Sequence, residues 1–156
     1  MTYFSEIVHL SDIARVHGDR CPEKKAFVFE DRVVTYKEFD INSEKVANGL
    51  VLENVNEQDH VAYMDKNSDR FYELVMGCAK SNSVIVGINW RLAPPEVAYI
   101  LNDSNAKILF VGEDFFGLIE KILKDVPSIE KVICMSGKNK DWPTYEDWRD
   151  KQSDSI

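Results

Sequence analysis

The chain has 156 residues, 44% hydrophobic and 29% charged, which is typical of one globular domain with a sizeable core. Its formal net charge of −8 and pI near 4.9 argue against a broad basic face, so we expect no nucleic-acid partner. No apolar run approaches the roughly 20 residues that span a bilayer, and the first residues do not resemble a signal peptide. We therefore expect no transmembrane segment and a cytoplasmic location.

The N-terminal third predicts a helix, a hairpin and a second helix. Apolar residues at helical spacing predict a helix over residues 5–17, which Gly18 can close. Two short strand patterns, 26–30 and 32–35, predict a β-hairpin. Thr35 and Glu38 have the spacing of a capping box, which predicts a long helix starting at this point. Its apolar stripe consists of Tyr36, Phe39, Val46, Ala47 and Leu50.

The middle of the chain has the pattern of a βαβ unit. Residues 60–64 and 84–88 read as strands, and apolar residues at helical spacing over 71–80 predict the helix between them. Ser68 is the expected N-cap, and Asn82 is the expected left-handed residue after the helix. The strand at 84–88 shows no polar alternation, so we expect it to be central in a parallel sheet.

The remaining pattern alternates helices and strands. A helix begins at Pro94-Pro95 and turns Val97, Ile100 and Leu101 inward. Strands are expected at 107–111 and 131–135, with a helix over 115–124 between them. This alternation predicts an α/β fold with a doubly wound, mostly parallel sheet, preceded by the N-terminal helix and hairpin. We expect residues 1–156 to form a single domain.

The regular alternation stops after Gly137. Residues 142–148 predict one short helix, for which Thr144 is the expected N-cap. The residues that follow are polar, so we expect 137–156 to be a partly loose tail.

The sequence lacks the common motifs of catalysis and phosphate binding. Its seven glycines form neither GxGxxG nor GxxxxGK[ST], and no GxSxG elbow occurs. The three histidines lack the spacing of a metal pair, and the cysteines (Cys21, Cys78 and Cys134) are isolated, which favours reduced thiols. We assign no catalytic, cofactor-binding or metal-ligating residue.

One general rule still points to a candidate site. Open α/β sheets bind ligands beyond the carboxyl ends of their strands, and polar residues stand at three of these ends. They are Asp65-Lys66-Asn67, Asn89-Trp90-Arg91 and Gly112-Glu113-Asp114. The competing interpretation is structural: Asn89 and Arg91 would bind backbone carbonyls, and Asp114 would cap the next helix. Trp90 fits either a packing role or the wall of a pocket.

A family resemblance adds to these patterns. The run KNSDRFYELVMGCAKSNSVIVGINWRLAPPEVAYILNDSNAKILFV resembles the early part of the adenylate-forming acyl-CoA synthetases, most closely the bacterial fatty-acid–CoA ligases. Asn89, Arg91 and Leu92 match the family's Asn-x-Arg-Leu loop, and Pro95-Glu96 with Tyr99-Ile100-Leu101 match the helix behind it. The resemblance covers roughly residues 4–135. Ser81-Asn82-Ser83 and Gly87 depart from it, which indicates a divergent member.

The resemblance implies ATP-dependent activation of a carboxylate, with Mg²⁺, to an acyl-adenylate, followed by transfer to coenzyme A. The family's Ser/Thr/Gly-rich loop ending in Pro-Lys-Gly, its adenine-binding segment, its ribose-binding Asp and its C-terminal lysine have no counterpart here. We therefore expect an incomplete N-terminal part of a fatty-acid–CoA ligase that binds none of these cofactors and is not catalytic alone. Truncation is the simplest explanation for their absence.

Two other functions remain open at this point. The same scaffold could serve as a non-enzymatic association or regulatory module, and an exposed sheet edge would then favour a homo-oligomer. A flavodoxin-like nucleotide-binding domain fits the order of strands and helices but lacks a phosphate loop. The sequence does not indicate the acyl chain length.

Overall fold

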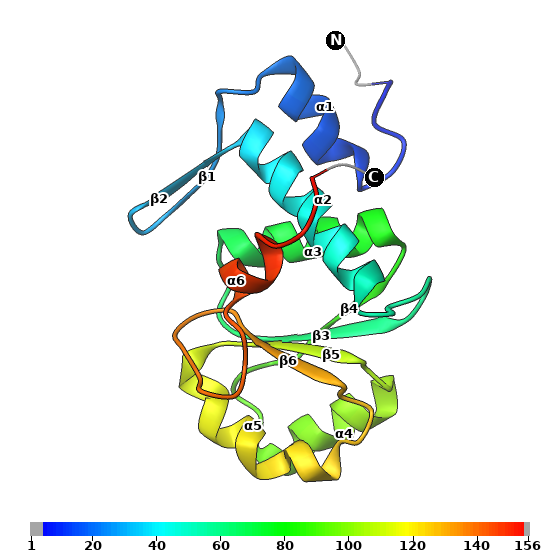
Figure 1. Ribbon diagram of the computed structural model, residues 1–156, viewed down its shortest axis with the longest axis vertical. Helices are drawn as coiled ribbons and strands as arrows, with labels where there is room; N and C mark the ends of the chain where they lie inside the picture. The colour runs from blue at the N-terminus through cyan, green and yellow to red at the C-terminus, as the bar shows by residue number, and fades with distance from the viewer. Residues whose placement is uncertain (1–4, 155–156) are drawn as a thin grey trace.

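A four-stranded parallel sheet forms the centre of the protein in a computed structural model, which describes residues 5–154 (Figure 1). In spatial order its strands are β4 (Val84–Gly87), β3 (His60–Met64), β5 (Ile108–Val111) and β6 (Lys131–Cys134). All three pairings are parallel, with Val61 opposite both Ile85 and Ile108. The predicted fold class, a doubly wound and mostly parallel α/β sheet, is confirmed.

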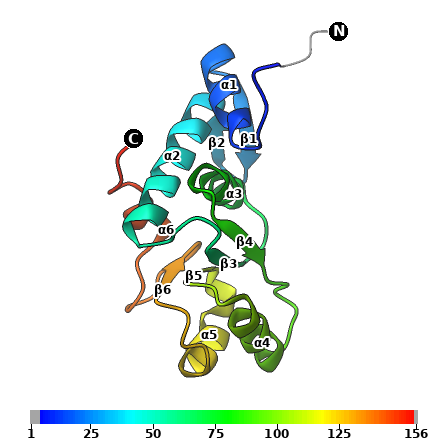
Figure 2. The same cartoon turned by 90° about the vertical axis from the view of Figure 1, so that its right-hand side faces the viewer.

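Helices cover both faces of this sheet (Figures 1 and 2). On one face lie α2 (Tyr36–Leu52), α3 (Asp69–Ser81) and α6 (Tyr145–Arg149). On the other lie α4 (Pro94–Ser104) and α5 (Phe116–Ile122), and α5 is flanked by the short 3₁₀ turns η1 (Glu113–Phe115) and η2 (Leu123–Asp125). Because βα crossovers place their helices on both faces, the strands between them can be apolar throughout, and β5 is buried along its whole length.

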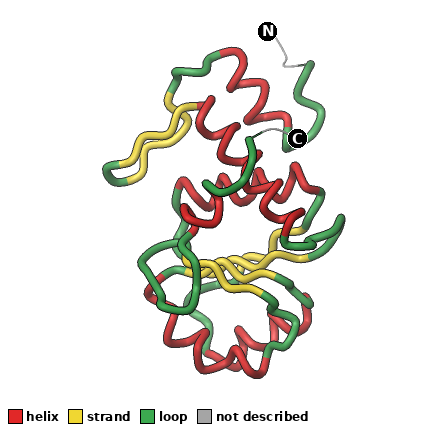
Figure 3. Tube along the Cα trace, viewed as in Figure 1, coloured by secondary structure: helices red, strands yellow, loops and turns green. Residues whose placement is uncertain are grey.

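An N-terminal layer lies outside the α2–α3 face. It contains α1 (Asp12–Arg20) and the antiparallel hairpin of β1 (Lys25–Phe29) and β2 (Arg32–Thr35). Figure 3 shows that the hairpin stands apart from the central sheet. Its predicted position is confirmed, as is the capping box that follows it: Glu38 N donates to Thr35 Oγ1 at 3.2 Å, and Thr35 N donates to Glu38 Oε2 at 2.8 Å.

The prediction that the strand at 84–88 is central is wrong. The strand, β4, ends at Gly87 and lies at the sheet edge, and its three apolar residues are only half buried. After β4 the chain crosses to the far side of β3, which therefore takes a central position. A strand without polar alternation is covered by other elements on both faces of the sheet. The same pattern does not show whether other strands pair with both of its edges.

The first helix also differs from its prediction. It begins at Asp12, where the carboxylate accepts from the N–H groups of Val8 and His9 at 3.0 and 2.9 Å. It then continues through Gly18, at which a Cβ would lie 3.2 Å from the Cβ of Asp40. Gly18 therefore allows α1 and α2 to approach closely and does not end the helix.

Other local predictions have mixed outcomes. Asn82 adopts the predicted left-handed conformation, with φ of 56°. Ser68 is the N-cap residue of α3, but its side chain makes no capping bond. The single helix expected over 115–124 is divided between α5 and the two 3₁₀ turns.

Helix α6 confirms the short helix predicted within 142–148. The Thr144 hydroxyl accepts from Asp147 N at 3.2 Å, as a capping residue should. Tyr145 and Trp148 are buried in the core between the sheet and α2. The predicted looseness of the rest of 137–156 stays a prediction. Among residues 5–154, no helix is long and apolar enough to cross a membrane.

Candidate functional site

A cleft of about 250 Å³ opens at the carboxyl edge of the sheet. Its walls come from the hairpin tip, the start of α3 and the residues that follow β3, β5 and β6. The chain leaves β3 toward the α3 face and leaves β5 toward the α5 face, so the two connections diverge. A divergence of this kind between neighbouring parallel strands is where open α/β sheets place ligands.

Two of the three predicted strand ends meet in this cleft. Asp65 and Lys66 come from the end of β3, and Glu113 and Asp114 follow β5. The third group, Asn89-Trp90-Arg91, does not line it. Ser136, which sequence reasoning missed, does line it, and the same carboxyl-end rule applied to the predicted strand at 131–135 would have found it.

Asp65 connects the three strand ends. Its Oδ1 accepts from Lys66 N at 2.7 Å, and its Oδ2 accepts from the Ser136 hydroxyl at 3.3 Å. The Ser136 oxygen in turn accepts from Glu113 N at 3.1 Å. A Cβ at Gly112 would lie 2.1 Å from Asp65 Oδ1, so only glycine permits this approach. Burial raises the pKa of Asp65 above its ordinary value.

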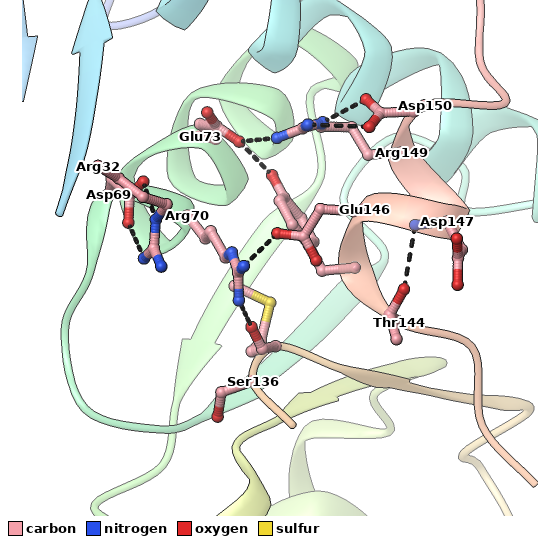
Figure 4. Close-up of polar contacts among 12 residues, drawn as sticks. Arg32, Asp69, Arg70, Glu73, Ser136, Thr144, Glu146, Asp147, Arg149 and Asp150 are labelled. Carbon is pink, nitrogen blue, oxygen red and sulfur yellow. Dashed lines mark hydrogen bonds and ion pairs between the residues drawn. The ribbon is translucent and has the colours of Figure 1, made fainter. Parts of the chain in front are cut away.

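The basic side chains of the cleft already have carboxylate partners, and Figure 4 shows those of Arg32 and Arg70. Lys66 Nζ lies 2.8 Å from Asp114 Oδ2. Arg32 binds Asp69 through two nitrogens at 3.0 and 2.6 Å.

Arg70, the third basic side chain of the cleft, pairs with Glu146 and donates to the carbonyl of Met135. Burial alone would raise the pKa of Asp69, but the ion pair with Arg32 holds it below its ordinary value. Each basic side chain of the cleft is thus paired with a carboxylate of the same chain.

The loop after β4 is ordered by contacts other than the predicted ones. The contact of Asn89 is with a backbone N–H and not the predicted carbonyl: its Oδ1 accepts from Arg91 N at 3.0 Å. The Arg91 guanidinium lies over the Trp90 ring at 4.0 Å, and that ring packs 6.1 Å from Phe115. Trp90 therefore serves as a packing residue. The prediction that Asp114 caps the next helix is also wrong, since it lies inside η1 and pairs with Lys66.

All three cysteines are free, and burial raises the pKa of Cys78 to about 12, which keeps it a thiol. Within residues 5–154, no group of three or more His, Cys, Asp or Glu side chains is arranged to hold a metal ion.

Comparison with known proteins identifies the family. The family model described as AMP-binding enzyme matches residues 14–155. The chain belongs to the AMP-binding enzyme family. The resemblance to adenylate-forming acyl-CoA synthetases, in their N-terminal portion, is thereby confirmed.

Individual relatives agree with this assignment. The fatty acid–[acyl-carrier-protein] ligase ScoC of Streptomyces coeruleorubidus is 35% identical over 81% of this chain and 24% of its own length. The indoleacetate–CoA ligase of Aromatoleum aromaticum is 26% identical over 96% of this chain and 29% of its own length. The crystal structure of the anthranilate CoA ligase AuaEII in complex with anthranoyl-AMP superposes with a TM-score of 0.88 at 27% identity. The superposition covers 95% of this chain and 28% of the AuaEII chain.

The chain matches only a part of each of these relatives. The chain spans about a quarter of the length of the curated relatives it matches. It corresponds to the N-terminal portion of an AMP-binding acyl-CoA or acyl-carrier-protein ligase.

Proposed function

We propose that this chain is the N-terminal scaffold of a ligase that activates a fatty acid with ATP, and that the chain alone does not catalyse adenylation. The fatty-acid substrate is supported by the relative named as a fatty acid–[acyl-carrier-protein] ligase. Other relatives are named as CoA ligases for aromatic or hydroxy acids, so the acyl acceptor we propose is the thiol of coenzyme A or of a carrier protein. A cytoplasmic location belongs to the same proposal.

The observation that carries the proposal is that every basic side chain of the cleft is paired with a carboxylate of the same chain. A phosphate-binding site needs cations or backbone N–H groups aimed at the ligand. Here Lys66, Arg32 and Arg70 are held by carboxylates of the same chain, and no glycine-rich loop follows a strand. The described residues therefore do not fit ATP and Mg²⁺, which family membership implies for the whole enzyme. We place those groups, and coenzyme A, outside this chain's own contacts.

Exchange of radiolabelled pyrophosphate into ATP tests the proposal directly. The 156-residue chain is incubated with ATP, Mg²⁺ and a panel of fatty acids from short to long chain length. A complete ligase of the family serves as the positive control for the panel. We expect no exchange above the rate without protein, and fatty-acid-dependent exchange by the isolated chain would contradict the proposal.

A second candidate function, association through the open sheet edge, is supported by β4. One edge of β4 pairs with β3, and no strand among residues 5–154 pairs with the other. Unpaired strand edges bind other strands, including those of a second copy. Light scattering between about 1 and 100 μM distinguishes the two cases, because an associating edge gives a mass that rises with concentration. A constant monomer mass would exclude self-association in this range.

A further inference from the structure

Helix α6 is short and lies far along the chain from the helices that it contacts. It has five residues, fewer than an isolated helix needs in water, so its helical form depends on docking. Two of its aromatic side chains provide the apolar part of that docking: Tyr145 is fully buried and Trp148 is 3% exposed. The Trp148 ring packs 5.3 Å from Phe110 of β5 and lies directly on Gly49 of α2.

Two of the polar contacts of α6 converge on one carboxylate, in addition to the bond from Trp148 Nε1 to Glu53 Oε1 at 3.2 Å. Glu73 of α3 is only 1% exposed. Its Oε1 accepts from Asn42 Nδ2 of α2 at 2.7 Å. Its Oε2 accepts from the Tyr145 hydroxyl at 2.8 Å and from Arg149 Nη1 at 2.9 Å, and Figure 4 shows the bond from Arg149. Both bonds from α6 therefore end on a single oxygen.

We propose that Glu73, Tyr145 and Arg149 form a latch that holds α6 on the α2–α3 pair and allows α6 to detach as a unit while the sheet stays folded. The latch is a property of this chain itself and goes beyond the proposed function, so it stands or falls independently of it.

The partners of the latch keep other contacts when α6 leaves. Asn42 remains bonded to Glu73, and Arg149 remains bonded to Asp150 at 2.8 and 3.1 Å, because Asp150 moves with it. The apolar residues beneath, from α2, α3 and the strands, pack against one another as well as against α6. Detachment also returns a buried charge pair to water, which compensates part of the lost contact energy. An all-apolar helix has no such compensation.

The site borders a cavity on one side. A cavity of about 420 Å³ is bounded by the hairpin, α2, α3 and α6, and Glu73 and Arg149 form part of its wall. Hydration of the two charges can therefore begin there without opening the rest of the core.

The latch is connected to the cleft through Arg70. This side chain pairs with Glu146 of α6 and donates to the Met135 carbonyl, next to Ser136 of the cleft. When α6 detaches, Arg70 loses its carboxylate partner. The state of the latch thus sets both the direction of the chain beyond residue 150 and the charge of the cleft.

Amide hydrogen exchange of the 156-residue chain, followed by mass spectrometry, tests the latch. Peptides covering 135–150 are compared with peptides covering β3 and β5. In the parent we expect 142–150 to exchange faster than the strands. In Arg149→Met, which removes the guanidinium but keeps an unbranched side chain, exchange over 135–150 should rise at least about tenfold while β3 and β5 stay unchanged. Tyr145→Phe removes only the hydroxyl and should give a smaller rise over the same residues.

Arg15→Met is the matched control, since it removes an arginine–carboxylate pair that is exposed and remote from α6. It should leave 135–150 unchanged. The latch is wrong if 142–150 and the strands exchange at one common rate in the parent. The latch is also wrong if both arginine variants accelerate amide exchange over 135–150, or if neither does. It is wrong as well if Arg149→Met accelerates exchange in β3 and β5 as much as over 135–150. If Arg149→Met does not fold, Tyr145→Phe decides by the same comparison.

Discussion

The two faces of the sheet are built by different means. The helices of the α4–α5 face come from one continuous stretch, β4 to β6, and the buried polar residues among 5–154 (Ser43, Asp69 and Glu73) lie outside that stretch. The α2–α3–α6 face joins segments that lie up to about a hundred residues apart, and it contains the buried carboxylates Asp69 and Glu73. Local apolar patterning is enough to specify the first face. The second needs polar contacts that select one arrangement of distant segments.

The largest expected effect compares one residue from each face. Glu73→Ala removes the acceptor of three donors and leaves Arg149 without its buried partner, so we expect a loss of about 3–5 kcal/mol in unfolding free energy. Ile119→Ala on the α5 face leaves a cavity and should cost about 2–5 kcal/mol. Urea unfolding measures both.

The two variants should differ in cooperativity. Glu73→Ala should release α6 before the sheet unfolds, which lowers the denaturant slope, while Ile119→Ala should keep the parent slope. Equal slopes for the two variants would show that both faces respond alike.

Two glycines, one on each face of the sheet, give the next largest expected effects. A Cβ at Gly49 would lie 2.6 Å from the Trp148 ring, so Gly49→Ala should displace α6 and cost about 1–3 kcal/mol. Gly117 of α5 has open space around its Cβ position, so Gly117→Ala should stabilise by roughly 0.5–1 kcal/mol. Thermal unfolding and Trp fluorescence report both, and a destabilised Gly117→Ala would refute the packing described for α5.

The pH dependence of stability isolates Glu73. Burial raises its pKa in the folded chain, although Arg149 and the other donors act in the opposite direction. Between the unfolded and the folded pKa, the folded state therefore keeps a proton that the unfolded state releases, so the stability from this group is present at low pH and is lost as pH rises through the folded pKa. In Glu73→Gln that dependence disappears.

The measurement is the difference in unfolding free energy between parent and Glu73→Gln from pH 4.5 to 7.5. The advantage of the parent should shrink with rising pH, by at most about 1.4 kcal/mol per pH unit. A difference that grows with pH would mean that the three donors outweigh burial. The titratable neighbours common to both proteins are Arg32, Glu38, Asp69, Arg70, Tyr145, Glu146 and Arg149.

The smallest expected effects concern helix starts on the two faces. Thr35→Ala removes the cap of α2 and should cost about 1 kcal/mol. Helix α4 begins after Ala93, which has no side-chain acceptor, so Ala93→Ser should add a cap and stabilise by up to about 1 kcal/mol. Thermal melts of both variants test the pair, and a shift of the same sign in both would contradict it.

Much of the fold follows from the sequence because its signals are local. The capping box at Thr35, the left-handed Asn82 and the cap at Thr144 each depend on neighbouring residues. The edge position of β4 could not be predicted, because it depends on which side of β3 the chain returns to.

The candidate site was predictable in part. The carboxyl-end rule brings Asp65 and Asp114 together, but the sequence does not show that Lys66 and Arg70 are already paired. The contacts of Glu73 with Tyr145 and Arg149 span more than seventy residues, so helical periodicity reports only that α3 is amphipathic.

The coding sequence that follows the Ile156 codon tests the central claim, that this chain is the scaffold of a ligase whose chemical groups lie elsewhere. We predict an in-frame continuation into a Thr-, Ser- and Gly-rich loop ending in Pro-Lys-Gly. A stop codon directly after Ile156 would contradict it, because the scaffold would then be the entire gene product.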